Sequence, residues 1–222
     1  MPVCSSCTGS HGQSANQAIY AKEFRRHVHQ LLLMGYRRLD APSCRSFEEE
    51  RISGDLKEAM RLITEDEDVD EWAVHLTVRD EAPVNLPGIH GRRRPRIDLE
   101  VERTQRGRHP RWRFEAKRLR NDTSVEAYMG SDGLGCYLVG RYAADQEEAG
   151  MLGYVQSQDE QTWAGQISDC IATNPGTCRV RTDGQWRGCD VVDGLDYCYS
   201  TKHDRDAPLG PIEVTHVLLR FH

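Results

Sequence analysis

The chain has 222 residues, 38% of them hydrophobic and 29% charged, with a formal net charge of −6 at pH 7. This composition suits one compact domain with additions and excludes a wholly disordered chain. No apolar run approaches the roughly 20 residues that cross a bilayer, and the first residues lack the basic region and apolar stretch of a secretory signal. We therefore expect a cytoplasmic protein without a membrane partner.

The first part of the chain is predicted to form a loose arm and two helices. Residues 1–16 are rich in Ser, Gly and Cys, which is typical of a frayed terminus. A helix is expected over residues 18–38, with Gly35 capping or interrupting it. A clearer helix follows over residues 47–63, with Ser46 as its N-cap. Its apolar side chains have helical spacing, namely Ile52, Leu56, Ala59, Met60 and Ile63.

Three strands are predicted next. The β-branched and aromatic residues over 72–78 indicate the first strand. Two segments of strict alternation follow a loop over residues 80–95. Residues 96–102 place apolar side chains on one face and acidic ones on the other, and residues 111–117 alternate in the same way. The connection between these two segments is short enough for a hairpin.

The second half is predicted to complete an α/β fold with a central mixed sheet. A helix is expected over residues 125–143, a buried strand over 151–155 and a helix over 160–172. A loop-rich stretch then leads to two final strands, 195–200 and 212–221. We therefore expect three parts: an N-terminal arm and helix (1–45), a core (46–172) and a loop-rich C-terminal β extension packed on the core (173–222).

Eight cysteines are spread along the chain, and a domain of this size does not need disulfides to hold its fold. We therefore expect free thiols. Cys4, Cys7 and His11 have the spacing of half a zinc site, but no second tight Cys/His pair follows them in the sequence. A frayed terminus is the simpler interpretation of this segment.

The basic residues are concentrated in one segment. Between Arg92 and Arg120 there are twelve basic and four acidic residues, a local net charge of +8 that leaves −14 for the rest of the chain. Clustered arginines bind phosphates and release condensed counterions. We therefore expect a polyanionic partner at this segment, and the alternative is a solvated charged face.

The two alternating strands bring acidic and basic side chains together. Asp98 is expected near Glu115 and Lys117 on the polar face of the hairpin. Two carboxylates suit a hard divalent cation such as Mg²⁺, which activates water and clamps the oxygens of a displacement at phosphorus. Lys117 would orient the attacking water and stabilise the charge that develops on the phosphate. The alternative is an ordinary amphipathic hairpin whose acidic strand pairs with its basic strand.

The run Arg96-Ile97-Asp98-Leu99-Glu100, followed after a hairpin by Phe114-Glu115-Ala116-Lys117, resembles the PD-(D/E)XK core of restriction endonucleases and related defence and repair nucleases. The resemblance covers residues 46–172 and implies a restriction-endonuclease-like α-β-β-β-α-β core. Ile97 stands where proline is usual, at a position that varies widely in the family. The resemblance implies that Asp98 and Glu115 are metal ligands, that the Ala116 carbonyl is a third ligand, and that Lys117 is catalytic.

Many members of this family also use a glutamate from the first helix. Glu48, Glu49 and Glu50 are available here, and Glu49 continues the spacing of the apolar positions, which aims it at the sheet. We therefore expect Glu49 to be an auxiliary catalytic residue. Contacts to substrate phosphates are expected from five arginines, Arg92, Arg93, Arg94, Arg118 and Arg120.

These features predict a Mg²⁺-dependent deoxyribonuclease, with Mn²⁺ able to substitute, and by resemblance an effector of a bacterial anti-phage defence or restriction system. Its partner would be DNA. Any ATP use would belong to a partner ATPase, helicase or sensor protein, because the sequence has no phosphate loop ending in Gly-Lys-Ser/Thr. A homo-oligomer would suit double-strand cleavage by a single-site enzyme. Two alternatives stay open: a non-catalytic nucleic-acid-binding module of the same fold, and a protein-interaction subunit of a defence complex.

Overall fold

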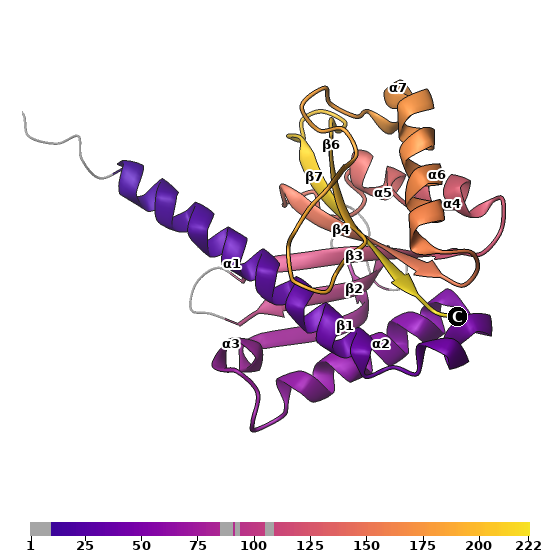
Figure 1. The fold of residues 1–222 in the computed structure, drawn as a ribbon. Helices are drawn as coiled ribbons and strands as arrows, with labels where there is room; N and C mark the ends of the chain where they lie inside the picture. The colour runs from indigo at the N-terminus through magenta and orange to yellow at the C-terminus, as the bar shows by residue number, and fades with distance from the viewer. Residues whose placement is uncertain (1–9, 85–90, 92–93, 105–108) are drawn as a thin grey trace, which may run out of the picture.

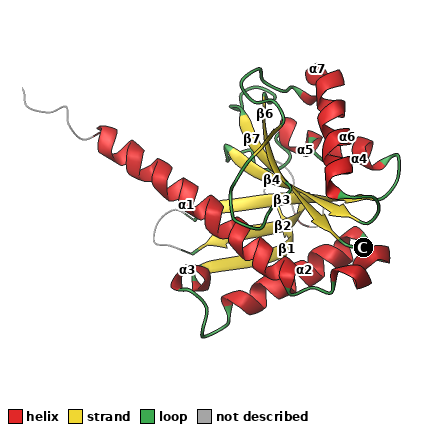
Figure 2. Ribbon diagram, in the orientation of Figure 1, coloured by secondary structure: helices red, strands yellow, loops and turns green. Residues whose placement is uncertain are grey.

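The computed structural model describes residues 10–84, 91, 94–104 and 109–222. It has a mixed α/β architecture in which helices flank one seven-stranded mixed sheet (Figures 1 and 2). The helices are α1 (Ser10–Arg37), the 3-10 helix η1 (Ala41–Ser46), α2 (Glu49–Thr64), α3 (Glu71–Val74), α4 (Ser124–Met129), α5 (Gly135–Leu138), α6 (Glu160–Thr173) and α7 (Pro175–Cys178). The strands are β1 (Leu76–Pro83), β2 (Arg96–Arg103), β3 (Arg111–Leu119), β4 (Glu148–Val155), β5 (Arg187–Gly188), β6 (Cys198–His203) and β7 (Ile212–Arg220). The expected fold class is confirmed at this level.

The strands are ordered β1-β2-β3-β4-β7-β6-β5 across the sheet. β1, β2 and β3 form an antiparallel meander, and the expected hairpin of alternating strands is its second half. β3, β4 and β7 are parallel neighbours, and β6 and β5 continue the sheet in antiparallel fashion. Parallel pairing needs a crossover connection, which α4 and α5 supply between β3 and β4.

Each face of the sheet is covered by its own apolar layer. On one face α1 and α2 bury Leu31 and Leu56 against Phe114 of β3. On the other face α5 and α6 bury Tyr137 and Trp163 in a second cluster with residues of β4 and β7. Two covered faces explain why β4 and β7 are buried almost continuously, since parallel strands in the middle of a sheet expose neither side.

Helix α2 follows the predicted pattern, but its beginning differs from the prediction. The five apolar positions of the prediction are all buried, and Gly35 of α1 lets the two helices approach, because a Cβ there would lie 2.5 Å from Cγ of Met60. Gly35 therefore sits inside α1, where it neither caps nor interrupts the helix. Ser46 is not the N-cap of α2. It ends η1, and α2 begins at Glu49 with two glutamates in its first turn, which the helix dipole favours.

The segment predicted as the first strand divides into a helical turn and a later strand. Residues 71–74 form α3, and β1 begins only at Leu76 and runs to Pro83. Trp72 stacks on His27 of α1 with 4.7 Å between ring centroids, and its Nε1 donates to Asp70. The aromatic residue that favoured a strand is therefore used in packing against α1.

The helix predicted over residues 125–143 is broken into α4 and α5. The break follows from glycine, because a Cβ on Gly133 would lie 2.2 Å from the Tyr128 carbonyl oxygen. Gly140 has φ +69°, a conformation that other residues rarely adopt. The glycines therefore let the chain form two short helices, α4 and α5, between β3 and β4 in place of one continuous helix.

The C-terminal segment is part of the main sheet. β7 pairs with β4 over eight residues, and β6, predicted at 195–200, lies three residues later at 198–203. Residues 10–16, expected in the loose arm, belong to α1, while Cys4 and Cys7 lie outside the described residues. None of the helices in the described part of the chain is both long enough and apolar enough to cross a membrane.

Candidate active site

Strands β2 and β3 separate at the point where their acidic residues meet. Their pairing extends only from Leu99 and Phe114 to Glu102 and Arg111. β3 continues to Leu119 with β4 as its neighbour, so the edge of β3 that faced β2 is left open beyond Phe114. Asp98 is the first residue of β2 beyond the last pair, and it lies at this opening.

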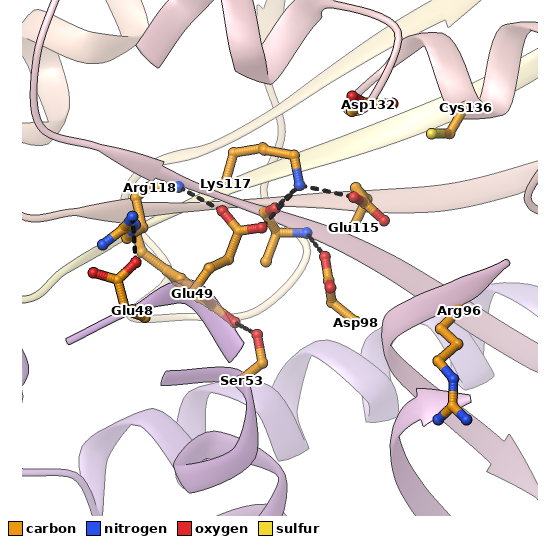
Figure 3. Close-up of polar contacts among 12 residues, drawn as sticks. Glu48, Glu49, Ser53, Arg96, Asp98, Glu115, Lys117, Arg118, Asp132 and Cys136 are labelled. Carbon is orange, nitrogen blue, oxygen red and sulfur yellow. Dashed lines mark hydrogen bonds and ion pairs between the residues drawn. The ribbon is translucent and has the colours of Figure 1, made fainter. Parts of the chain in front are cut away.

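Side chains satisfy the backbone groups that the opening leaves free. The Ala116 N–H donates to Asp98 Oδ2 at 2.7 Å, and the Arg118 N–H donates to Glu49 Oε2 at 3.1 Å (Figure 3). The Ala116 carbonyl oxygen accepts from Lys117 Nζ at 2.6 Å. Because unpaired backbone groups in a buried site are costly, these bonds hold Asp98, Glu49 and Lys117 against the free edge of β3.

Lys117 is at the centre of the cluster. Its ammonium donates to Glu115 Oε1 at 2.8 Å and Glu49 Oε1 at 2.9 Å, in addition to the Ala116 carbonyl. The side chain is 14% exposed and that of Glu115 is 6% exposed. Glu49 reaches this point from the first turn of α2, whereas Glu50 is exposed. The contact between α2 and β3 therefore brings together residues that lie 68 positions apart.

The cluster contains more negative than positive charge. Burial, reinforced by the neighbouring Asp98, raises the pKa of Glu115 to about 8. Burial also raises the pKa of Asp98 to about 6, although Lys117 and the Ala116 amide act in the opposite direction. Burial lowers the pKa of Lys117, but Glu115, Glu49 and Asp98 together outweigh it and raise the pKa above its usual value. A lysine with a raised pKa is fully charged at neutral pH.

The arrangement of oxygens suits a hard divalent cation. Among the residues that the structure describes, no group of three His, Cys, Asp or Glu side chains is arranged as a metal site. The donor set offered here is instead two carboxylates, Asp98 and Glu115, with the Ala116 carbonyl. Glu115 Oε2 is buried and lacks a hydrogen-bond partner. Mg²⁺ is commonly held by one or two carboxylates with water and phosphate oxygens completing the shell, so these residues fit such an ion.

The five arginines predicted to contact phosphate differ in their surroundings. Arg118 is turned toward the start of α2, where it forms an ion pair with Glu48 at 2.6 Å and donates to the Phe47 carbonyl. The side chain of Arg120 is exposed. Arg94 Nε donates to the Gly91 carbonyl at 3.3 Å. Arg92 and Arg93 lie outside the described residues.

Several residues that support the site had no signal in the sequence. Tyr137 donates from its hydroxyl to the carbonyl oxygens of Arg113 and Gly150, and so joins β3 to β4 just before Glu115. Tyr142 donates to the Arg96 carbonyl, two residues before Asp98. Cys136 lies on the same side of β3 as Glu115 in Figure 3. Burial raises the pKa of its thiol to about 11, and the negative charge of Glu115 acts in the same direction. Aromatic residues in a broken helical segment look like ordinary core residues, which is why the sequence pattern did not identify them.

The comparisons with known proteins returned nothing for this chain: no family model, no curated protein and no solved structure matches it. Functional interpretation therefore depends on the site itself.

Proposed function

We propose that the chain is a divalent-metal-dependent nuclease that hydrolyses phosphodiester bonds of DNA. One observation carries the proposal. Asp98, Glu115, Glu49 and Lys117 converge at the open edge of β3, with two carboxyl groups of raised pKa and one partly buried ammonium. Perturbed carboxyl groups gathered around one cation are typical of a catalytic centre and uncommon on an ordinary amphipathic hairpin.

The order of elements supports a PD-(D/E)XK core as the framework. α2 is followed by the antiparallel strands β1, β2 and β3, then by the broken helical segment α4–α5, and then by β4 parallel to β3. This is the α-β-β-β-α-β order that the sequence resemblance implies. In that framework Asp98 and the Glu115-Ala116-Lys117 run come from adjacent strands, as they do here.

Each residue of the cluster then has a role in hydrolysis. Asp98, Glu115 and the Ala116 carbonyl would hold the ion, which when bound lowers the pKa of water and neutralises charge on the phosphate. Lys117 would orient the attacking water and stabilise the negative charge that develops on the phosphate oxygens. Glu49 holds Lys117 from the side of α2, and its second oxygen is anchored by the Arg118 N–H. The exposed Arg120 would contact the DNA backbone.

The wider role follows from the resemblance alone. We propose a nuclease effector of bacterial anti-phage defence or restriction, acting in the cytoplasm and dependent on a partner for any ATP use. Double-strand cleavage by a protein with one such site per chain would be served by a homodimer.

A cleavage assay with metal controls tests the proposal. Purified protein is incubated with linear DNA, circular DNA or RNA in Mg²⁺, Mn²⁺ or EDTA. We expect cleavage of DNA with either metal and none in EDTA. Asp98→Asn and Lys117→Met should each remove cleavage while the far-ultraviolet circular dichroism and melting temperature stay native.

The outcome separates the rival functions. Binding of DNA without cleavage in any metal would favour a non-catalytic nucleic-acid-binding module. Cleavage by both variants at the wild-type rate would show that the site is elsewhere. Neither cleavage nor binding of DNA or RNA would favour a protein-interaction subunit, and the nuclease proposal would then fail.

A further inference from the structure

The ammonium of Lys117 is bonded to two residues of the donor set described above, Glu115 and Ala116. Its three partners are all oxygen atoms, Ala116 O at 2.6 Å, Glu115 Oε1 at 2.8 Å and Glu49 Oε1 at 2.9 Å. They come from three separate residues on two elements, β3 and α2, and two of them belong to carboxyl groups. An ammonium with three donors and three acceptors at these distances is fully coordinated.

Two of these three oxygens belong to the donor set described above for a divalent cation. Glu115 Oε2 has no hydrogen-bond partner, but Glu115 Oε1 and the Ala116 carbonyl already accept from Lys117, so an ion at the roughly 2.1 Å that Mg²⁺ requires would lie next to the ammonium. Two cations so close together in a buried site also repel each other strongly. Lys117 and the ion would therefore compete for this part of the site.

We propose that Lys117 is a built-in competitor of the divalent cation, which gives up the Glu115 and Ala116 oxygens when the ion binds and stays attached to Glu49. This inference rests on the proposed function, because it concerns the metal site of that nuclease. It describes how the site is regulated: the metal-free protein holds its catalytic lysine on three oxygen atoms, and the lysine would become free to turn toward the phosphate when an ion is bound.

Glu49 is placed to retain the displaced lysine. Its Oε2 accepts the Arg118 N–H at 3.1 Å, which fixes the carboxylate to the backbone of β3, and its Oε1 accepts from Lys117. Glu49 lies outside the three-residue metal set, so its hold on Lys117 does not conflict with an ion. It acts as a positioning residue that keeps the ammonium next to the site in both states.

Metal affinity measured without DNA tests the competition. Mn²⁺ binding at pH 8 is measured by calorimetry and by the electron paramagnetic resonance of free Mn²⁺ for the wild type, Lys117→Met and Lys57→Met. Lys57 pairs with Asp80 at 3.5 Å and makes no contact with the three oxygens, so its variant controls for the loss of one positive charge. We expect Lys117→Met to lower the Kd for Mn²⁺ at least tenfold, and Lys57→Met to change it less than threefold.

A second measurement follows the lysine itself in the unmutated protein. The chain has four lysines, Lys22, Lys57, Lys117 and Lys202, so isotope labelling of the lysine side chains gives a simple NMR spectrum. Mg²⁺ should shift the Lys117 side-chain signal, which is identified by its absence from Lys117→Met or Lys117→Gln, and leave the other three in place. This readout uses the native fold even where a variant is unstable.

The results distinguish this inference from the proposed function. An unchanged or raised Kd in Lys117→Met, or a Lys117 signal that Mg²⁺ does not move, overturns the competition even if the wild type cuts DNA. Tighter Mn²⁺ binding by Lys117→Met supports the competition even if the wild type cuts nothing, in which case only the nuclease proposal fails. Absence of Mn²⁺ binding by every form overturns both.

Discussion

Two sets of acidic side chains lie along strands β2 and β3, and nearby cations compensate their charge to different degrees. At one end, Glu100 meets Arg113 at 2.8 Å and Arg79 at 3.6 Å, and Glu102 meets Arg79 at 3.0 Å. At the other end, Asp98, Glu115 and Glu49 lie around one lysine. The first set has an arginine for every carboxylate, and the second has three carboxylates for one ammonium.

This difference in charge compensation distinguishes the carboxylates of a structural ion-pair network from those of the proposed site. Arginine stays charged at every relevant pH and its forked donors match a carboxylate, so the Glu100 end is a permanent ion-pair network. At the Asp98 end burial raises the pKa of both Asp98 and Glu115, which marks a deficit of positive charge. Under the proposed function, a divalent cation would supply the missing positive charge.

The largest expected effect is on cleavage and compares one glutamate from each set. Glu115→Gln should lower the rate of DNA cleavage by roughly a thousandfold, because the amide cannot supply the charge that holds the ion. Glu100→Gln should leave the cleavage rate within a few fold of wild type, because its carboxylate serves only the ion-pair network. The measurement is initial cleavage rate at saturating Mg²⁺. Equal losses in the two variants would remove the distinction between the sets.

The next largest effect is a loss of stability, and it is expected when the Glu100 ion-pair network is broken. Arg113 is buried and holds both Glu100 and Asp145. Arg113→Met should lower the free energy of unfolding by about 3–5 kcal/mol, because it leaves the buried Glu100 without its closest partner. Urea denaturation measures this loss. The exposed Arg120 is the control, and Arg120→Met should stay within about 0.5 kcal/mol of wild type.

A smaller effect is expected in the pH dependence of the metal-free protein. The pKa of Glu115 is about 8 in the folded state and about 4.5 when unfolded, so the folded protein binds this proton more tightly. The stability from that proton is present below pH 4.5 and is lost as pH rises through 8. In EDTA, raising the pH from 4.5 to 8 should lower the free energy of unfolding of the wild type by about 1–3 kcal/mol more than that of Glu115→Gln.

The Glu100→Gln variant gives this pH experiment its reference. Thermal unfolding at a series of pH values is compared for all three proteins, so that groups common to them cancel. Parallel curves for the wild type and Glu115→Gln would mean that burial does not perturb Glu115 as the structure indicates. Addition of Mg²⁺ should make the wild-type curve flatter, since a bound cation favours the ionised carboxylate.

The smallest effect concerns DNA binding by the exposed Arg120. Arg120→Ala should weaken binding by a few fold and lower the slope of log affinity against log salt concentration by about 0.9, the value for one lost phosphate contact. Fluorescence anisotropy at several salt concentrations in EDTA measures the slope without cleavage. Arg181→Ala is the control, because Arg181 pairs with Asp183 and Asp204 in the C-terminal segment. Equal slopes for both variants would place the DNA elsewhere.

Local patterns predicted much of the fold. The apolar spacing of α2 and the alternation of β2 and β3 were readable because burial on one face imposes a period on the sequence. Patterns failed where a distant contact decided the outcome. Trp72 packs on α1 within a helical turn, and glycines at 133 and 140 let the segment before β4 turn back on itself. His27, the partner of Trp72, and Leu209, which lies against Gly140, are far away in the sequence, whereas Gly133 meets the carbonyl of the nearby Tyr128.

The candidate site divides in the same way. Asp98, Glu115 and Lys117 could be placed on one polar face from the alternation alone, and Glu49 from the phase of its helix. The opening between β2 and β3 could not be predicted, because it depends on β3 finding β4 as its new neighbour. The use of Asp98 and Glu49 to satisfy the Ala116 and Arg118 amides follows from that opening.

The sequence by itself determined which residues alternate between core and surface, and therefore which acidic and basic side chains share a face. Tertiary structure decided which of those charges are neutralised. Arg79 and Arg113 reach Glu100 across paired strands, while Lys117 is the one cation that the described part of the chain places among Asp98, Glu115 and Glu49, where the strands separate. The physical reason is that charge compensation depends on distances of a few ångströms between elements far apart in the chain, and only the packed sheet and helices set those distances.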